Sequence, residues 1–66
     1  MDRSELIGYE GESVQLDYTK GDHPHSRTGL VYSVAIKVVV FWPFEDDNQE
    51  VEILIPFEEI DDIKKL

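Results

Sequence analysis

Short runs of apolar residues, separated by polar ones, follow each other along this chain with a spacing typical of β-strands. In residues 13–19 the apolar Val14, Leu16 and Tyr18 alternate with polar neighbours. A period of two marks a strand with one buried face. Four further strands are predicted from runs rich in β-branched and aromatic side chains. These runs cover residues 28–34, 36–42, 50–55 and 61–66.

Glycine, proline and charged residues separate the predicted strands. Residues 20–29 hold two glycines and a proline, so we expect a long loop between the first two strands. The charged residues 45–49 predict a hairpin tip. Pro56, with acidic residues shortly after it, predicts one turn of 3₁₀ helix before the last strand. Near the N-terminus, Ser4 is placed to cap a short helix or turn within residues 1–11.

Five short strands with a 3₁₀ turn before the last one predict an all-β fold, and specifically a small closed barrel, because closure removes exposed strand edges. A chain of 66 residues has room for one domain, which we expect to span residues 1–66. Without cysteine, neither disulfides nor thiolate metal sites are expected. The longest apolar run, residues 38–44, is too short to cross a bilayer. The N-terminus lacks the apolar stretch of a secretory signal, so we expect a cytoplasmic protein.

Three segments carry a resemblance to a known group of barrels. They are residues 11–16 (GESVQL), 28–32 (TGLVY) and 53–60 (ILIPFEEI). In this order they resemble the SH3-like barrels, and within them the Sm-like proteins and the C-terminal barrel of ribosome maturation factors. The resemblance implies a five-stranded SH3-like barrel with a bent second strand, and for Sm-like proteins a homo-oligomer. The chain departs from the RNA-binding Sm proteins after Ile55, where Pro-Phe-Glu-Glu stands in place of their basic motif. The resemblance therefore implies the fold without RNA binding.

The charge distribution narrows the choice of partner. Fifteen acidic residues against six basic ones give a net charge of -9, which argues against direct binding to nucleic acid or anionic membranes. Between residues 38 and 63 there are nine acidic residues and neither Lys nor Arg. Such a negative surface steers a basic protein partner, while solubility alone is the competing interpretation. The candidate partner-binding acids are Glu45, Asp46, Asp47, Glu58, Glu59, Asp61 and Asp62.

The predicted strand 36–42 is apolar on both faces. One face carries residues that we assign to the core, namely Ile36, Val38, Val40 and Trp42. The other face then presents Val39 and Phe41 to solvent, and Leu54 on the next strand points the same way. We expect Val39, Phe41 and Leu54 to form an exposed apolar patch, a feature that often marks an interface. Cover of this patch by the N-terminal segment is the alternative.

Catalytic and metal-binding patterns are weak. His23 and His25 flank a proline, whereas a metal site needs three or four converging ligands, so we expect a solvated loop there. The serines lack the nucleophile elbow that would expose one of them to a base. The acidic segment 45–50 lacks the ligand spacing of a calcium loop. We therefore expect neither an enzyme nor a bound metal or cofactor.

These observations favour a non-enzymatic, acidic protein-interaction module. It would bind a protein with a basic surface through the apolar patch, with the acidic rims providing steering. One alternative is an acidic inhibitor that mimics nucleic acid and occupies the basic groove of a nucleic-acid-binding enzyme. Another is a homo-oligomer of the Sm-like kind, in which a second copy covers the patch.

Overall fold

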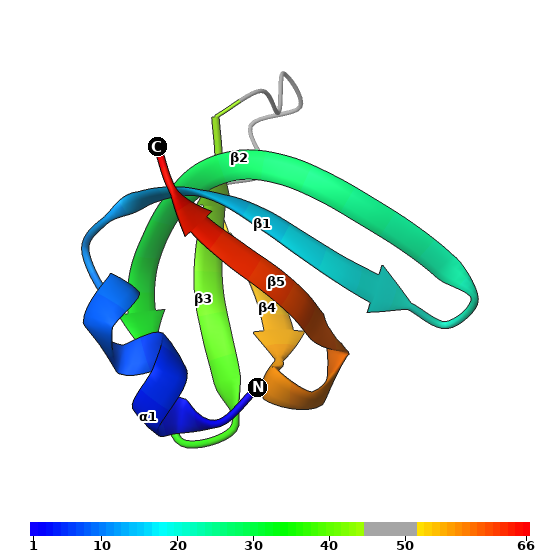
Figure 1. The fold of residues 1–66 in the computed structure, drawn as a ribbon, viewed down its shortest axis with the longest axis horizontal. Coiled ribbons are helices and arrows are strands. Elements are labelled where there is room, and N and C mark those ends of the chain that lie inside the picture. The colour runs from blue at the N-terminus through cyan, green and yellow to red at the C-terminus, as the bar shows by residue number, and fades with distance from the viewer. Residues whose placement is uncertain (45–51) are drawn as a thin grey trace.

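The computed structural model describes residues 1–44 and 52–66, and within these residues the chain forms five β-strands and three short helical segments (Figure 1). The prediction of an all-β protein with a 3₁₀ turn before the last strand is confirmed. The elements are α1 (Arg3–Leu6), η1 (Ile7–Tyr9), β1 (Ser13–Lys20), β2 (His23–Val34), β3 (Val38–Pro43), β4 (Ile53–Pro56), η2 (Phe57–Glu59) and β5 (Ile60–Lys65).

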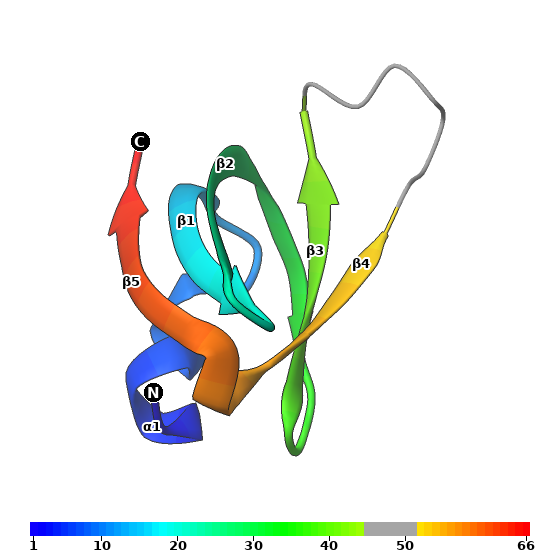
Figure 2. The same ribbon diagram turned by 90° about the vertical axis from the view of Figure 1, so that its right-hand side faces the viewer.

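All five strands belong to one antiparallel sheet in the order β4-β3-β2-β1-β5. The long β2 is strongly curved, so that the sheet bends around its core (Figures 1 and 2). The terminal strands β4 and β5 are joined by η2 but do not pair with each other within the described residues. The sheet is therefore open there, and the prediction of a closed barrel is wrong. The edge at β4 is blunted instead, because this strand has only four residues and ends in Pro56, which has no N–H to donate.

The prediction of a long loop over residues 20–29 is wrong. Strands β1 and β2 form one continuous hairpin, paired from Lys20 opposite His23 to Ser13 opposite Leu30, and only Gly21 and Asp22 form the turn. This hairpin projects beyond the rest of the sheet (Figure 1). Proline is tolerated within it because β3 pairs with β2 only from Gly29 onward, so β2 is an edge strand at Pro24.

The core is a single cluster to which every strand contributes. It holds the buried side chains of Leu6, Val14, Leu16, Tyr18, Val31, Val34, Val39, Phe41, Ile55, Ile60 and Ile63. Helix α1 places Leu6 in this cluster and so covers one end of the curved sheet (Figure 1). The predicted cap, Ser4, lies inside the helix, and Asp2 caps it instead. The Asp2 N–H donates to Glu5 Oε2 at 3.0 Å.

Polar contacts hold the N-terminal segment onto the sheet. Arg3 Nε donates to the carbonyl of Ala35 at 3.0 Å, in the β2–β3 connection. Glu10 Oε2 accepts a hydrogen bond from the Val34 N–H at 2.8 Å. The N-terminal ammonium group donates to the carbonyl of Phe57 at 3.0 Å, which ties the chain start to η2. These bonds order a segment whose burial rests mainly on one side chain, that of Leu6.

Candidate interaction surface

The outside of the sheet carries a group of apolar side chains over β2, β3 and β4. Directly opposed residues of paired strands point to the same side of a sheet. Leu30 lies opposite Trp42, and Val40 lies opposite Leu54, so these side chains share one face. We call Leu30, Tyr32, Val40, Trp42 and Leu54 the outer apolar face. Leu54 is 62% exposed and Tyr32 is 54% exposed, while the other three side chains are half-buried.

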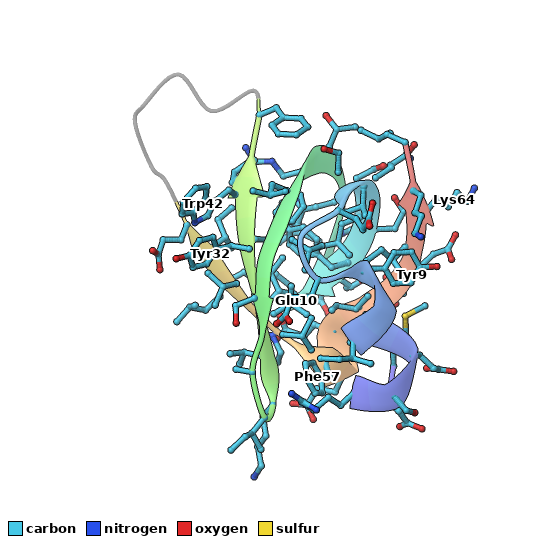
Figure 3. The ribbon with its side chains drawn as sticks, turned by 90° about the vertical axis from the view of Figure 1, so that its left-hand side faces the viewer. Tyr9, Glu10, Tyr32, Trp42, Phe57 and Lys64 are labelled. Atoms are coloured by element: carbon cyan, nitrogen blue, oxygen red, sulfur yellow. The ribbon has the colours of Figure 1, made fainter. Side chains whose placement is uncertain are left out.

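The aromatic pair at the centre of this face is stacked. The ring centroids of Tyr32 and Trp42 lie 4.4 Å apart with an interplanar angle of 10°, and Figure 3 shows the two rings together on the outside of the sheet. Tyr32 sits at a β-bulge, since Val31 pairs with Phe41 and Ser33 pairs with Val40. A bulge redirects the side chain of its extra residue. This bulge thus places Tyr32 over the indole, while Val31 and Val34 on either side of the bulge both lie in the core.

The indole N–H of Trp42 is covered, and it has no hydrogen-bond acceptor within residues 1–44 and 52–66. A buried donor without an acceptor costs about 1–3 kcal/mol. Trp42 therefore contributes apolar area to this surface, and its indole N–H makes no hydrogen bond within the described part of the chain.

The predicted patch of Val39, Phe41 and Leu54 is wrong for two of its three members. Val39 and Phe41 are fully buried, with 0% exposure, and face the core beside Ile55. Leu54 is exposed as predicted. The physical reason lies at Gly29: a Cβ atom built there would lie 2.7 Å from Phe41 Cζ, so the missing side chain provides the space for the phenyl ring.

An apolar surface does exist on β3 and β4, but it is the opposite face of β3. The alternative, in which the N-terminal segment covers the patch, agrees with the structure for Val39 and Phe41, because Leu6 of α1 is buried in one cluster with them. The segment does not extend to the outer apolar face. Leu6 enters the core, and Tyr9 lies on the far side of the molecule from Tyr32 and Trp42 (Figure 3). Sequence reasoning assigned Trp42 to the core and did not assign Tyr32 to any site. The only sequence signal for their true place was Gly29, whose missing side chain leaves space for the Phe41 ring.

The acidic candidates fall into separate groups. Glu58 and Glu59 lie on η2, directly after β4, and Glu58 is exposed. On β5, Asp61 Oδ2 accepts a hydrogen bond from Thr19 Oγ1 at 2.7 Å, and Asp62 pairs with Lys64 at 3.9 Å. These two carboxylates already have intramolecular partners. The remaining predicted acids, Glu45, Asp46 and Asp47, lie outside the described residues.

The histidines do not form a metal centre in the described residues, where no group of three or more His, Asp or Glu side chains is placed to hold a metal ion. His23 and His25 lie on β2, and His25 stacks on Tyr18 with ring centroids 5.1 Å apart. No helix in residues 1–44 and 52–66 has the length and apolar character needed to cross a membrane.

Comparison with known proteins adds no relative to this picture: no protein-family model, curated protein or solved structure matches the chain. The likeness to SH3-like and Sm-like barrels therefore stays a prediction from the sequence.

Proposed function

We propose that this protein is a non-enzymatic, cytoplasmic interaction module, of the SH3-like type, that binds a protein partner through its outer apolar face. The observation that carries the proposal is the stacked and exposed pair of Tyr32 and Trp42 beside the exposed Leu54. Large exposed apolar patches on small proteins mark interaction sites more often than chance contacts. Tyrosine and tryptophan are also the residues that most often dominate binding energy at interfaces.

The geometry of the aromatic pair favours binding. Stacking against Trp42 already restricts the Tyr32 ring, so less side-chain entropy is lost when a partner covers it. Across the sheet, Leu54 offers an aliphatic surface next to Val40. A partner that inserts an apolar side chain between these groups removes both from water, at about 25 cal/mol per Å² of apolar area.

Acidic residues beside the outer apolar face indicate that the partner carries positive charge. Strand β4 has an exposed acidic residue at each end, Glu52 before it and Glu58 after it. With a net charge of -9 for the whole chain, the field attracts a basic protein surface and raises the rate of encounter. The partner that fits is therefore a protein with an apolar anchor surrounded by Lys and Arg.

The test compares a double variant of the outer apolar face with a control variant at an exposed apolar residue elsewhere. Tyr32→Ser combined with Leu54→Ser strips the outer apolar face, while Ile36→Ser removes an 82% exposed side chain in the β2–β3 connection, away from that face. Wild-type protein and both variants are used to capture partners from lysate, and each captured partner is then purified and titrated. We expect the double variant to bind roughly tenfold or more weakly, since anchor side chains commonly contribute above 1 kcal/mol each. The Ile36 variant should bind as the wild type does.

Two other results would contradict the proposal and favour one of its alternatives. A partner that binds the double variant as tightly as the wild type, and that dissociates as salt is raised, would favour the nucleic-acid mimic. If the wild type alone forms dimers or rings in analytical ultracentrifugation, and the double variant is monomeric, the partner is a second copy of the chain.

A further inference from the structure

A second surface lies on another side of the molecule, between the β1–β2 hairpin and β4. It is a cleft of about 490 Å³. The hairpin contributes Tyr18, Lys20, His25 and Arg27, and β4 contributes Ile53 and Leu54. Figure 2 looks at the hairpin from its tip and shows it between β5 on one side and β3 and β4 on the other.

The strand register explains why basic side chains line this cleft. Arg27 lies opposite Leu16, and His25 lies opposite Tyr18. Opposed residues share a face, and Leu16 and Tyr18 both point into the core. Arg27 and His25 therefore lie on the inner face of the hairpin, and Lys20 continues this face where the hairpin extends past the core. Because residues 20–29 form a hairpin and not a loop, Lys20, His25 and Arg27 lie in a row on one face.

The two cations of the cleft are available for a ligand. Within residues 1–44 and 52–66 the one ion pair joins Lys64 to Asp62, so neither Lys20 nor Arg27 is neutralised by a described carboxylate at ion-pair distance. Glu59 also lines the cleft, which leaves one more positive than negative group there. In a chain of net charge -9, this is a local reversal of sign, and it selects an anionic ligand.

The β4 side of the cleft offers apolar surface and, on the short edge that ends at Pro56, one residue whose backbone groups are free to pair. The Phe57 N–H donates to the Lys37 carbonyl at 2.9 Å, just beyond the paired residues of β3 and β4. In an antiparallel pair the bonding direction alternates from residue to residue. The N–H and C=O of Leu54 consequently point away from β3, toward the edge that no described strand pairs with.

We propose that this cleft binds an extended acidic peptide segment of a partner protein. A peptide carboxylate lies between Lys20 and Arg27, a neighbouring apolar side chain packs on Ile53, and the peptide backbone bonds to the N–H and C=O of Leu54. Addition of a peptide to a strand edge is a common mode of recognition. A nucleic acid fits less well, because its continuous phosphate charge requires many cations and the protein as a whole repels it. This site meets the outer apolar face at Leu54 and is otherwise built from other residues, and it would make the protein a connector between a basic partner and an acidic one.

The experiment pans a random peptide library against the protein and then titrates the enriched peptides by NMR. The double variant Lys20→Gln with Arg27→Gln tests the site, and Lys37→Gln with Lys65→Gln removes the same charge elsewhere. We expect enriched sequences rich in Asp and Glu, with chemical-shift changes at Tyr18, His25 and Leu54. The site variant should bind them roughly tenfold more weakly, since it removes both cations that face the peptide carboxylate. The control variant should retain binding.

Several outcomes would overturn the proposal. These are a failure to enrich any peptide, enrichment of basic peptides, or equal loss of affinity in the two double variants. Tighter binding of a single-stranded DNA oligonucleotide than of the acidic peptides would assign the cleft to nucleic acid instead. Thermal melts of both variants show whether each is folded. Since Lys20→Gln with Arg27→Gln leaves every residue of the outer apolar face unchanged, the two proposals can fail separately.

Discussion

At the scale of single residues, Gly29 leaves the space that the backbone of β3 and the Phe41 ring occupy. A Cβ atom at this position would lie 2.7 Å from Phe41 Cζ and 2.9 Å from Pro43 Cα. The nearest atom of all is the backbone carbonyl oxygen of Trp42, and Pro43 Cα is backbone as well, so rotation of the phenyl ring alone gives no relief. We expect Gly29→Ala to lower the free energy of unfolding by about 2 kcal/mol or more, the size of an overpacked core. Urea unfolding monitored by tryptophan fluorescence measures this loss.

The matched control for Gly29 is Gly8→Ala. A Cβ atom at Gly8 would meet no atom within 4 Å, so this change removes backbone freedom without a clash and should be neutral or slightly stabilising. If both alanine variants unfold at the same urea concentration, the packing of Phe41 against Gly29 does not set the position of β3.

The sequence shows that β3 is apolar on both faces but does not show which face is inside. Trp42 and Phe41 are both large, and assigning the face of Ile36, Val38, Val40 and Trp42 to the core was wrong. Which face of β3 is buried depends on residues of β2, because Phe41 packs against Gly29 and Trp42 stacks on Tyr32. The bulge at Tyr32 adds to the difficulty, since Val31 and Val34 both point inward at a spacing of three, which simple alternation does not predict.

At the scale of elements, the β1–β2 hairpin depends on its two-residue turn. Gly21, the first turn residue, has φ 63°, a conformation that the primed hairpin turns require and that β-branched residues disfavour. We expect Gly21→Val to cost about 1–2 kcal/mol, and Gly21→Asn to cost clearly less because asparagine tolerates this region. The loss should be local, since the tip of the hairpin lies outside the core.

Amide hydrogen exchange checks this locality. In Gly21→Val the amides of residues near the turn should exchange faster, whereas those of Val14 and Leu16, at the core end of β1, should keep most of their protection. Uniform loss of protection along β1 would mean that the hairpin tip and the core unfold as one unit. The same variant also bears on the acidic-peptide cleft, because Lys20 and His25 lie next to this turn.

Elements with a clear local signal were predictable, and those defined by pairing were not. The alternation of Val14, Leu16 and Tyr18 predicts β1, and Pro56 with its following acids predicts η2; both are confirmed. Residues 20–29 look like a loop because proline and glycine disfavour strands in general. They form a hairpin because β2 is an edge strand at Pro24, and this position follows only from where β3 ends.

At the scale of the whole molecule, the candidate surfaces follow from how the sheet is folded. The sequence predicted that β3 and β4 expose an apolar surface, and Leu54 is exposed there. It did not predict Tyr32 and Trp42, nor the gathering of Lys20, His25 and Arg27 opposite β4. Both depend on register, which depends in turn on the Gly21 turn and the Tyr32 bulge. Composition alone shows the excess of acids but not where the cations collect.

The same excess of charge acts on stability. Fifteen acids and six bases share a molecule whose radius of gyration is 10.7 Å, while the screening length is about 30 Å at 0.01 M salt and about 8 Å at 0.15 M. At low salt, nearly all carboxylates therefore repel one another, and at physiological salt only near neighbours do. We expect the melting temperature to rise with NaCl over this range, by about 5 °C for each kcal/mol of repulsion removed. Calorimetry or circular dichroism measures the shift.

A charge variant separates self-repulsion from other effects of salt. Glu12 and Glu52 are exposed, and Glu12→Lys with Glu52→Lys makes the net charge less negative while leaving the core unchanged. This variant should melt higher than the wild type at low salt, and its melting temperature should depend less on NaCl. An equal salt dependence in the two proteins would show that net repulsion is not what salt relieves. The acidic surface would then impose little cost on the fold, and selection for a basic partner would not be needed to explain why it is retained.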